Sequence, residues 1–378
     1  MSKSSPSFRW GLLGSGAVAH DFARSLELLP DHELIAVSSR SLERANRARE
    51  DLGAKRAYAN YRALCEDPDV DAIYVATPAA LHCEHVDLAL SARKPVLCEK
   101  PFTVNSEEAR KLVQKARTER VFCMEAMWMR FVPAIRELKA EVASGSIGEV
   151  RLLSAELGEL VPYDPAGRHF APALGGGSLL DLGVYALSLA WFILGRPIKG
   201  HAFSTPAPTG VDSQMIISLT YPNGALASLT CSFEQRLRNM AFVAGTLGSI
   251  ATDSPLYSPN RLTLIRHTPG SFSPEAGKRG KLHTFLSGHP KVVQLRREYA
   301  PLLRRIIRGD RKTKRLSYPG YGYQFEAAEV ARCVGQNLLE SPVMMLGESL
   351  EIMTAIDALR TSGEFDWSAG AGDDLANR

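Results

Sequence analysis

Three polar side chains have the types and the sequence neighbours that proton transfer requires. Asp181 and Tyr185 follow three consecutive glycines in an apolar stretch, and their spacing of four residues would place both on one face of a helix. A carboxylate and a phenol on one face could position a substrate hydroxyl and move its proton. Lys100 follows another apolar stretch, where a buried lysine is unfavourable unless it is paired or functional. A packing tyrosine, a capping or ion-paired aspartate and an exposed lysine are the structural alternatives.

The segment Gly11–Ala19 has the glycine pattern of a dinucleotide-binding turn, between an apolar stretch and a stretch with helical spacing. Gly14 would permit the tight turn, Gly16 would let the backbone approach a pyrophosphate, and Ala19 would allow close helix–strand packing. The helix N-terminus would supply amide donors to the phosphates. A structural glycine-rich turn is the alternative. The expected cofactor contacts are Gly14, Ser15, Gly16 and Ala17.

The residues after the second predicted strand favour NADP over NAD. An NAD-selective site usually carries an acidic residue here, which would repel a 2′-phosphate. This chain has Ser38, Ser39 and Arg40 instead, with Arg44 one helical turn later. Because guanidinium groups match the geometry and charge of phosphate, we expect Ser39, Arg40 and Arg44 to contact the cofactor. Alternatively, the two arginines are solvated residues at the start of a helix.

Two further motifs follow apolar stretches of this region, namely Thr77-Pro78 with His82, and Glu99-Lys100-Pro101. Ligands of an open α/β sheet lie beyond the carboxyl ends of its strands. His82 is an alternative to Tyr185 as the group that moves the proton. The residues expected near the nicotinamide are Thr77, Pro78, His82, Glu99 and Lys100.

These residues must be positioned by alternating strands and helices in the first 125 residues. Apolar runs predict strands over 8–13, 33–37, 70–76 and 95–98, and helical spacing predicts helices over 17–28, 42–52 and 82–91. Two further units are expected near 106–119 and 121–125. Strict alternation indicates a parallel sheet with helices on both faces, that is, an α/β fold of the Rossmann type. We therefore predict an NADP-binding domain over residues 1–125.

The pattern changes in the second predicted domain, residues 126–378. Strands over 150–159, 199–203, 211–221 and 225–236 follow one another with a hairpin turn at 222–224, which predicts a mainly antiparallel sheet in an α+β domain. Late helices are expected over 323–339 and 345–362, against the first domain or the edge of the sheet. A basic insertion over about 254–320 has ten basic and two acidic residues between 291 and 315. We expect an extended loop with an amphipathic helix there, and a phosphate or nucleic-acid patch or a partner contact are the alternatives.

Composition narrows the class of protein. The net charge of +4 over 378 residues gives no strong field that would indicate nucleic acid or membrane partners. Six scattered cysteines without a CxxC pair suit a reducing cytosol, and no metal site is expected. The first residues lack the apolar core of a secretory signal, and no run of about twenty apolar residues was found to span a bilayer. We expect a soluble cytoplasmic protein.

Taken together, the motifs resemble those of the glucose–fructose oxidoreductase / inositol dehydrogenase family (Gfo/Idh/MocA). The matching segments lie in the family's order over residues 8 to about 250: Gly14-Ser-Gly16, Thr77-Pro78, Cys98-Glu-Lys-Pro101, Glu125-Ala-Met-Trp128 and Gly176–Tyr185. Within the family the chain is most similar to dimeric dihydrodiol dehydrogenases and NADP-dependent D-xylose dehydrogenases. The resemblance implies an open-faced antiparallel sheet that commonly pairs to form a homodimer. It also implies that Lys100 is catalytic and that Tyr185, which replaces a histidine of many members, is the acid–base group.

These expectations define a reaction. Hydride would pass between NADP and a sugar or cyclic polyol, while Tyr185 takes the hydroxyl proton, Lys100 lowers the pKa of that phenol and Asp181 orients the substrate or Lys100. Oxidation of an aldose such as D-xylose at its anomeric carbon to the lactone is the favoured reaction. The alternatives are oxidation of a trans-dihydrodiol, reduction of a keto-sugar, and a dinucleotide-binding sensor without chemistry. Aromatic side chains that could wall the substrate pocket, or serve only in packing, are Trp128, Tyr163, His169 and Phe170.

Overall fold

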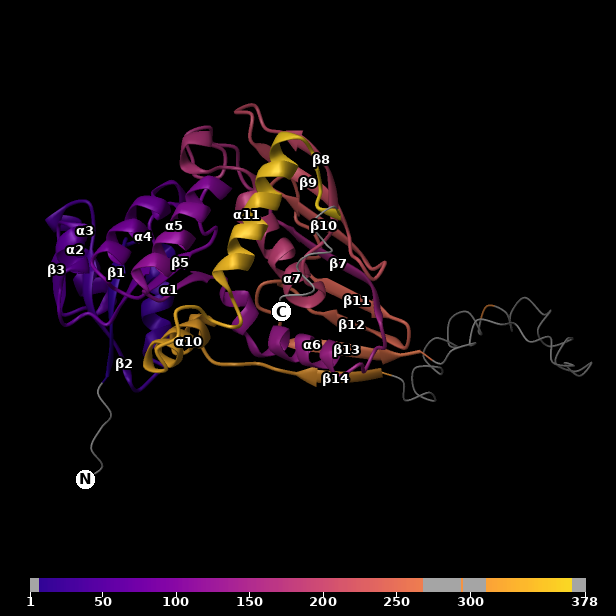
Figure 1. Ribbon diagram of the computed structural model, residues 1–378, viewed down its shortest axis with the longest axis horizontal. Helices are drawn as coiled ribbons and strands as arrows, with labels where there is room; N and C mark the ends of the chain where they lie inside the picture. The colour runs from indigo at the N-terminus through magenta and orange to yellow at the C-terminus, as the bar shows by residue number, and fades with distance from the viewer. Residues whose placement is uncertain (1–6, 268–293, 295–310, 369–378) are drawn as a thin grey trace, which may run out of the picture.

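A six-stranded sheet forms the first half of the molecule (Figure 1). The computed structural model describes residues 7–267, 294 and 311–368. All neighbouring strands of this sheet are parallel, in the order β3-β2-β1-β4-β5-β6, which confirms the Rossmann-type fold. Its strands are β1 (Phe8–Leu13), β2 (His32–Ser38), β3 (Arg56–Tyr58), β4 (Ala72–Val75), β5 (Val96–Glu99) and β6 (Cys123–Ala126). The helices between them are α1 (Ala17–Leu26), α2 (Leu42–Leu52), α3 (Tyr61–Cys65), α4 (His82–Ser91) and α5 (Ser106–Glu119).

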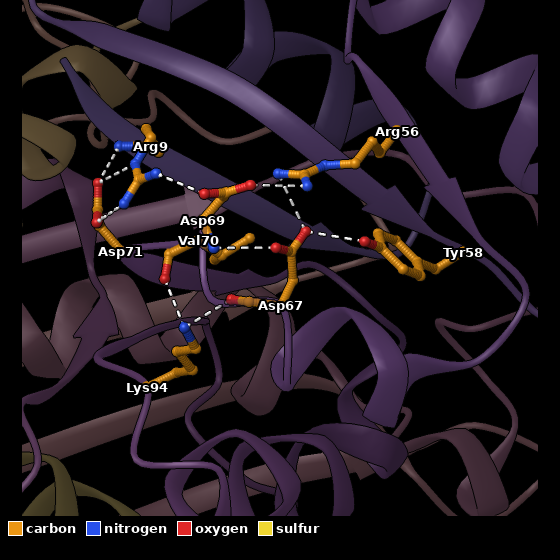
Figure 2. Close-up of polar contacts among 8 residues, drawn as sticks. All are labelled: Arg9, Arg56, Tyr58, Asp67, Asp69, Val70, Asp71 and Lys94. Carbon is orange, nitrogen blue, oxygen red and sulfur yellow. Dashed lines mark hydrogen bonds and ion pairs between the residues drawn. The ribbon is translucent and has the colours of Figure 1, made fainter.

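A polar network ties the amino ends of these strands together (Figure 2). Arg9, at the start of β1, pairs with Asp71 at 2.9 Å and with Asp69 at 3.2 Å. The ammonium group of Lys94, just before β5, donates to the backbone carbonyls of Asp67 and Val70, each at 2.7 Å. Because this network lies at the amino ends of the strands, their carboxyl ends, on the opposite side of the sheet, are left for ligand contacts.

A nine-stranded sheet forms the second half, in the order β14-β13-β12-β11-β7-β10-β9-β8-β15. Within the described strands of this second sheet, only β7 and β10 are parallel neighbours, so the expected mainly antiparallel sheet is confirmed. Its strands are β7 (Val150–Gly158), β8 (Lys199–Pro206), β9 (Asp212–Thr220), β10 (Leu226–Ser232), β11 (Ala241–Gly245), β12 (Gly248–Thr252), β13 (Arg261–Arg266), β14 (Arg311–Arg315) and β15 (Glu364–Asp366). The associated helices are α6 (Pro133–Ala143), α7 (Val184–Leu194), α10 (Tyr323–Gly335) and α11 (Leu346–Thr361).

The basic insertion differs from its prediction at both ends. Residues 261–266 and 311–315 form the antiparallel neighbours β13 and β14, where a loop was expected. β14 is an edge strand, a position at which charged side chains discourage further pairing. Lys314 of β14 also bonds to Glu137 and Glu141 of α6. The predicted amphipathic helix falls mainly on residues 268–293 and 295–310, outside the described residues.

One face of the second sheet is covered and the other is open. Met215, Ile217 and Leu219 of β9 are buried, whereas Ile216 between them is 54% exposed. The register sets Phe203 of β8 directly beside Ile216, and Leu226 of β10 beside Leu152 of β7. This open face agrees with the expected sheet. Its large exposed apolar side chains are Leu152, Phe203, Ile216, Leu226 and Phe242.

The chain returns to the first half at its end. Helix α10 packs against α1, and α11 packs against α5 (Figure 1). Asp357 of α11 accepts a hydrogen bond from the backbone of Ser106 at 2.7 Å, and Ser349 of α11 donates to Glu125 of β6 at 2.7 Å. Both late helices therefore lie against the first domain, one of the two positions that the sequence analysis left open.

The segment Pro172–Leu194 is long and apolar enough to cross a membrane by length and composition, which the sequence analysis did not recognise. It contains a 3₁₀ turn (Pro172–Leu174), a π-helical turn and α7. In the folded chain 78% of its most apolar window is buried inside the protein. Most of α7 is buried, including Leu187 and Trp191, as in the core helix of a globular domain.

Candidate functional site

The structure brings Lys100 and Asp181 together from the two halves of the chain. Lys100 follows β5, and its ammonium nitrogen donates to the backbone carbonyl of Asp181 at 2.9 Å and to its Oδ1 at 3.0 Å. Burial alone would lower the pKa of Lys100, but the Asp181 carboxylate outweighs it and raises the pKa above its usual range. Lys100 therefore keeps its positive charge beyond the end of β5, paired with the Asp181 carboxylate.

Tyr185 lies beside this pair. A π-helical turn over Leu179–Gly183 leads into α7, and such turns are frequent at functional sites. The Lys100 ammonium lies 4.9 Å from the centroid of the Tyr185 ring. The Trp128 indole donates to the Tyr185 hydroxyl oxygen at 3.0 Å. All three residues predicted to be catalytic thus meet at one place.

The electrostatics of Tyr185 differ in part from the expectation. Burial raises its pKa to about 12, and the Lys100 ammonium opposes this shift without cancelling it. Lys100 therefore acts in the predicted direction, but the phenol keeps its proton at neutral pH. A neutral phenol suits donation of a proton to a carbonyl oxygen. In the opposite direction, oxidation of an alcohol, the phenol must first lose its proton before it can accept one, so this direction is favoured by alkaline conditions.

The turn between β1 and α1 fits a dinucleotide pyrophosphate. Gly14 has φ of +108°, and a Cβ atom there would lie 2.5 Å from the Ala76 carbonyl oxygen. A Cβ atom at Gly16 would meet nothing within 4 Å, so the N-terminus of α1 faces open space. The first turn of α1 has no acidic residue. Backbone donors there are available to an anion, as expected for the Gly14–Ala17 segment.

The residues that the sequence predicts to contact a 2′-phosphate lie at and just after the end of β2. The hydroxyl oxygens of Ser15 and Ser39 lie 3.4 Å apart, which joins the glycine turn to this strand end. Arg40 and Arg44 are exposed on the surface nearby. Neither arginine forms an ion pair within the described part of the chain, which leaves both free to contact an anion.

His82 is placed as a bridge between backbone segments. Its Nδ1 and Nε2 atoms lie 2.8 Å from the carbonyl oxygens of Pro101 and Thr77, and the ring is buried. Burial lowers its pKa. Because both ring nitrogens already have partners, His82 is suited to holding the Thr77-Pro78 and Glu99–Pro101 segments together. This geometry disfavours the alternative in which His82 moves the proton.

The four predicted pocket aromatics separate into two groups. Trp128 contacts Tyr185, and the His169 Nε2 atom lies 3.7 Å from a carboxylate oxygen of Asp181. Phe170 is instead buried in a small separate core with Phe233. Tyr163 is 49% exposed and packs edge-on against Phe170 at 5.1 Å. Trp128 and His169 therefore lie at the site, whereas the other two pack with each other.

Three residues at the site were not predicted. Arg168 donates to Asp181 Oδ1 at 3.2 Å, and the sequence signals near it were the predicted pocket residues Tyr163, His169 and Phe170. Tyr257 lies 5.5 Å from the Tyr185 ring and comes from the segment whose pattern was least informative. Tyr323, the first residue of α10, stacks on Trp128 at 4.9 Å.

Buried acids lie behind the Lys100 backbone. Tyr74 donates to Glu99, and the other carboxylate oxygen of Glu99 accepts from the Lys100 backbone at 3.2 Å. Burial raises the pKa of Glu99 to about 7. Burial likewise raises the pKa of Glu326, a completely buried residue of α10. Among the residues that the structure describes, neither carboxyl oxygen of Glu326 has a hydrogen-bond partner.

Within the same described residues, no group of three His, Cys, Asp or Glu side chains could hold a metal ion.

Two family models match the chain. The first, an oxidoreductase family with an NAD-binding Rossmann fold, covers residues 8–127, and the second, a GFO/IDH/MocA C-terminal domain, covers residues 135–251. A trans-1,2-dihydrobenzene-1,2-diol dehydrogenase from Bos taurus is 33% identical over 93% of this chain and 96% of that protein. The Mus musculus protein of the same name is 35% identical over 90% and 92%.

Solved structures show the same arrangement. A 3-ketoreductase from Actinomadura kijaniata, in complex with NADP and TDP-benzene, matches with a TM-score of 0.73 at 26% identity, covering 95% of this chain and 98% of that one. A levoglucosan dehydrogenase in complex with NADH and levoglucosan matches with a TM-score of 0.76 at 18% identity, covering 95% and 99%. At that identity the second match supports the fold alone.

Proposed function

Because this chain belongs to the GFO/IDH/MocA oxidoreductase family, we propose that it transfers hydride between NADP and a ring carbon bearing one of two vicinal hydroxyl groups. The observation that carries the proposal is the position of Lys100, bonded to Asp181 and 4.9 Å from the Tyr185 ring, directly after β5. Ligands of such sheets lie beyond that strand end. A bound NADP would supply the hydride acceptor or donor.

The route of the transferred proton can be inferred from the contacts that Tyr185 makes. Since the Trp128 N–H occupies one lone pair of the phenolic oxygen, the O–H group is directed elsewhere, toward a substrate oxygen. In reduction, Tyr185 gives its proton to the new alkoxide. In oxidation, it accepts the hydroxyl proton, and Lys100 and the Trp128 N–H both stabilise the phenolate while it forms. Asp181 holds the Lys100 ammonium in place.

The substrate we propose first is a trans-dihydrodiol. Support comes from the names of relatives that are about one-third identical over more than nine-tenths of the chain. An aldose such as D-xylose, which the sequence analysis favoured, shares the six-membered ring with vicinal hydroxyls and is the second candidate. His169 and the exposed Arg168 beside Asp181 offer polar contacts to a second hydroxyl group.

Absorbance of NADPH tests this proposal. We expect turnover with trans-1,2-dihydrobenzene-1,2-diol, and a parallel series with D-xylose, and with keto-sugars plus NADPH, separates the substrate classes. Turnover of D-xylose alone would assign the aldose reaction. Tight NADP binding without turnover in all three series would instead indicate the sensor.

The choice of cofactor is a separate prediction. Arg40→Asp is expected to weaken NADP binding about 10- to 100-fold, as loss of a charged hydrogen bond does, with a much smaller effect on NAD. Titration calorimetry measures both. The control is Arg47→Gln on α2, the helix that follows Arg40, since Arg47 pairs with Glu43. If the unmodified protein binds NAD more tightly than NADP, the assignment of Arg40 and Arg44 is wrong.

Assembly and location belong to the same proposal. We propose that two copies pair through the open face of the second sheet, whose exposed side chains include Phe203, Ile216 and Leu226. All six cysteines are free, and every one except Cys83 is buried, which supports a reducing cytoplasmic location.

A further inference from the structure

We propose that Asp212 is a positioning residue for the proton-transfer centre, because its carboxylate holds the turn from which Asp181 reaches Lys100. Asp212 is the first residue of β9, distant in sequence from that turn. Its Oδ2 atom accepts hydrogen bonds from the Ser178 hydroxyl at 2.9 Å and from the Leu179 backbone at 2.6 Å. The proposal rests on the proposed function only for its activity assay.

The turn has no cap of its own. Leu179 begins the π-helical turn, and the preceding residue, Ser178, makes no capping hydrogen bond. Backbone N–H groups at a helix start need a partner, and a side-chain acceptor there stabilises the first turn. Asp212 supplies this acceptor from a neighbouring strand, so the sheet fixes where the turn begins.

The glycines before the turn make this contact possible. Gly177 has φ of +125°, and a Cβ atom there would lie 2.5 Å from Asp212 Oδ1. The three-glycine motif, which the cofactor and proton chemistry leave unexplained, is thereby accounted for in part. It lets the chain pass against the carboxylate before Asp181.

Arg360 of α11 completes the arrangement. Its Nε atom lies 3.6 Å from Asp212 Oδ1, and its Nη2 atom donates to the Gly176 carbonyl at 3.4 Å. Burial raises the pKa of Asp212, whereas the two hydrogen bonds and Arg360 oppose that shift. Arg360 thus stabilises the carboxylate and contacts the turn that the carboxylate holds.

A shift of this turn would affect Lys100, because two hydrogen-bond acceptors of the Lys100 ammonium belong to Asp181. Asp181 offers Lys100 both its backbone carbonyl and its Oδ1, so a shift of the turn displaces both at once. Misplacement of a catalytic group by about 1 Å can reduce rate by about 10²-fold. The other titratable and charged groups that face Lys100 and Asp181 are Glu99, Tyr185, Arg168 and His169.

The test is Asp212→Asn, which preserves side-chain size. We expect kcat to fall at least about tenfold while the NADP dissociation constant changes less than about twofold. The alkaline rise in the rate of oxidation should move to higher pH, because a displaced Lys100 ammonium lowers the pKa of Tyr185 less. Ser178→Ala removes one of the two hydrogen bonds and should give a smaller shift in the same direction.

The matched control is Asp253→Asn. Asp253 Oδ1 likewise accepts two hydrogen bonds, here both from backbone N–H groups, of Asn260 and Arg261, each at 2.9 Å, but in the loop before β13. It is expected to lower stability without changing the pH profile. Arg360→Met adds a second test from α11. A cavity of about 280 Å³ borders Arg360, so the methionine side chain can be accommodated there.

A substrate-free measurement separates this inference from the proposed reaction. NMR spectra of the ¹³C-methylated lysines, recorded as pH is raised, should show Lys100 beginning to lose its proton at lower pH in Asp212→Asn than in the unmodified protein, whatever the substrate. An unchanged Lys100 titration and pH profile in Asp212→Asn would overturn the proposal. If Asp212→Asn does not fold, Ser178→Ala decides by the same two readouts.

Discussion

At the scale of single residues, Tyr185 keeps its proton at neutral pH. Its pKa is raised to about 12 by burial, and Lys100 is the positive neighbour that limits the increase. The two residues therefore act as one unit. Oxidation of an alcohol should accelerate with pH through the alkaline range.

Tyr185→Phe keeps the ring and should slow hydride transfer by about 10² or more, with NADP binding retained. Lys100→Met should slow the same step and move the alkaline rise to higher pH, since the phenolate loses its positive neighbour. The double variant should be little slower than either single one. Single-turnover kinetics measures all three. A Tyr185→Phe rate near that of the unmodified protein would contradict the assignment.

Glu99 predicts a pH dependence of stability. Its pKa rises on folding from 4.5 to about 7, so the stabilisation from its bound proton is present below pH 4.5 and is lost as pH rises through about 7. Between those limits the unfolding free energy should fall relative to Glu99→Gln by about 3 kcal/mol. Denaturant unfolding of both proteins at several pH values measures this difference. Glu43→Gln, at an exposed position, is the control, and a difference that does not vary with pH would contradict the prediction.

At the scale of elements, substitutions in the turn between β1 and α1 should separate an effect on folding from an effect on cofactor binding. Gly14→Ala places a side chain at φ of +108° and 2.5 Å from a carbonyl oxygen, so it should destabilise the protein by at least about 1–2 kcal/mol. Gly16→Ala meets no atom within 4 Å, so melting should be unchanged while NADP binding weakens. Thermal unfolding and calorimetry test the pair. Equal melting temperatures for the two variants would show that the close approach at Gly14 is relaxed.

Elements with a strong period or clear caps were predicted well. The helix over 42–52 matches α2, which begins after the Ser41 cap, and 82–91 matches α4. β3 was missed because its three half-buried residues show no alternation. The strands β11 to β15 were also missed, since three to six residues carry little pattern and their pairing depends on distant partners.

The candidate site was likewise predicted only in part. Lys100, Asp181 and Tyr185 stood in motifs whose neighbours signalled their position. The contacts that fix them came from elsewhere, such as Arg168 in an irregular loop and Asp212 at the start of β9. Such contacts depend on how strands and loops meet in three dimensions, which local periodicity does not report.

At the scale of the whole molecule, the open sheet face predicts an interface. Ile216→Lys places a charge beside Phe203 in the middle of that face and should convert a homodimer into monomers. Sedimentation velocity at micromolar concentration measures this. Leu28→Lys, at an apolar residue of the first half that is 41% exposed, should leave the dimer intact. A monomeric unmodified protein would contradict the proposed pairing.

The return of α10 and α11 to the first half has a consequence for how the chain is made. The surfaces of α1 and α5 that these helices cover emerge from the ribosome long before residues 323–361 are synthesised. At ordinary elongation rates, this interval lasts roughly 10–50 s. During translation the nascent cofactor-binding half therefore carries uncovered apolar patches, and chaperone occupancy should be highest in that window.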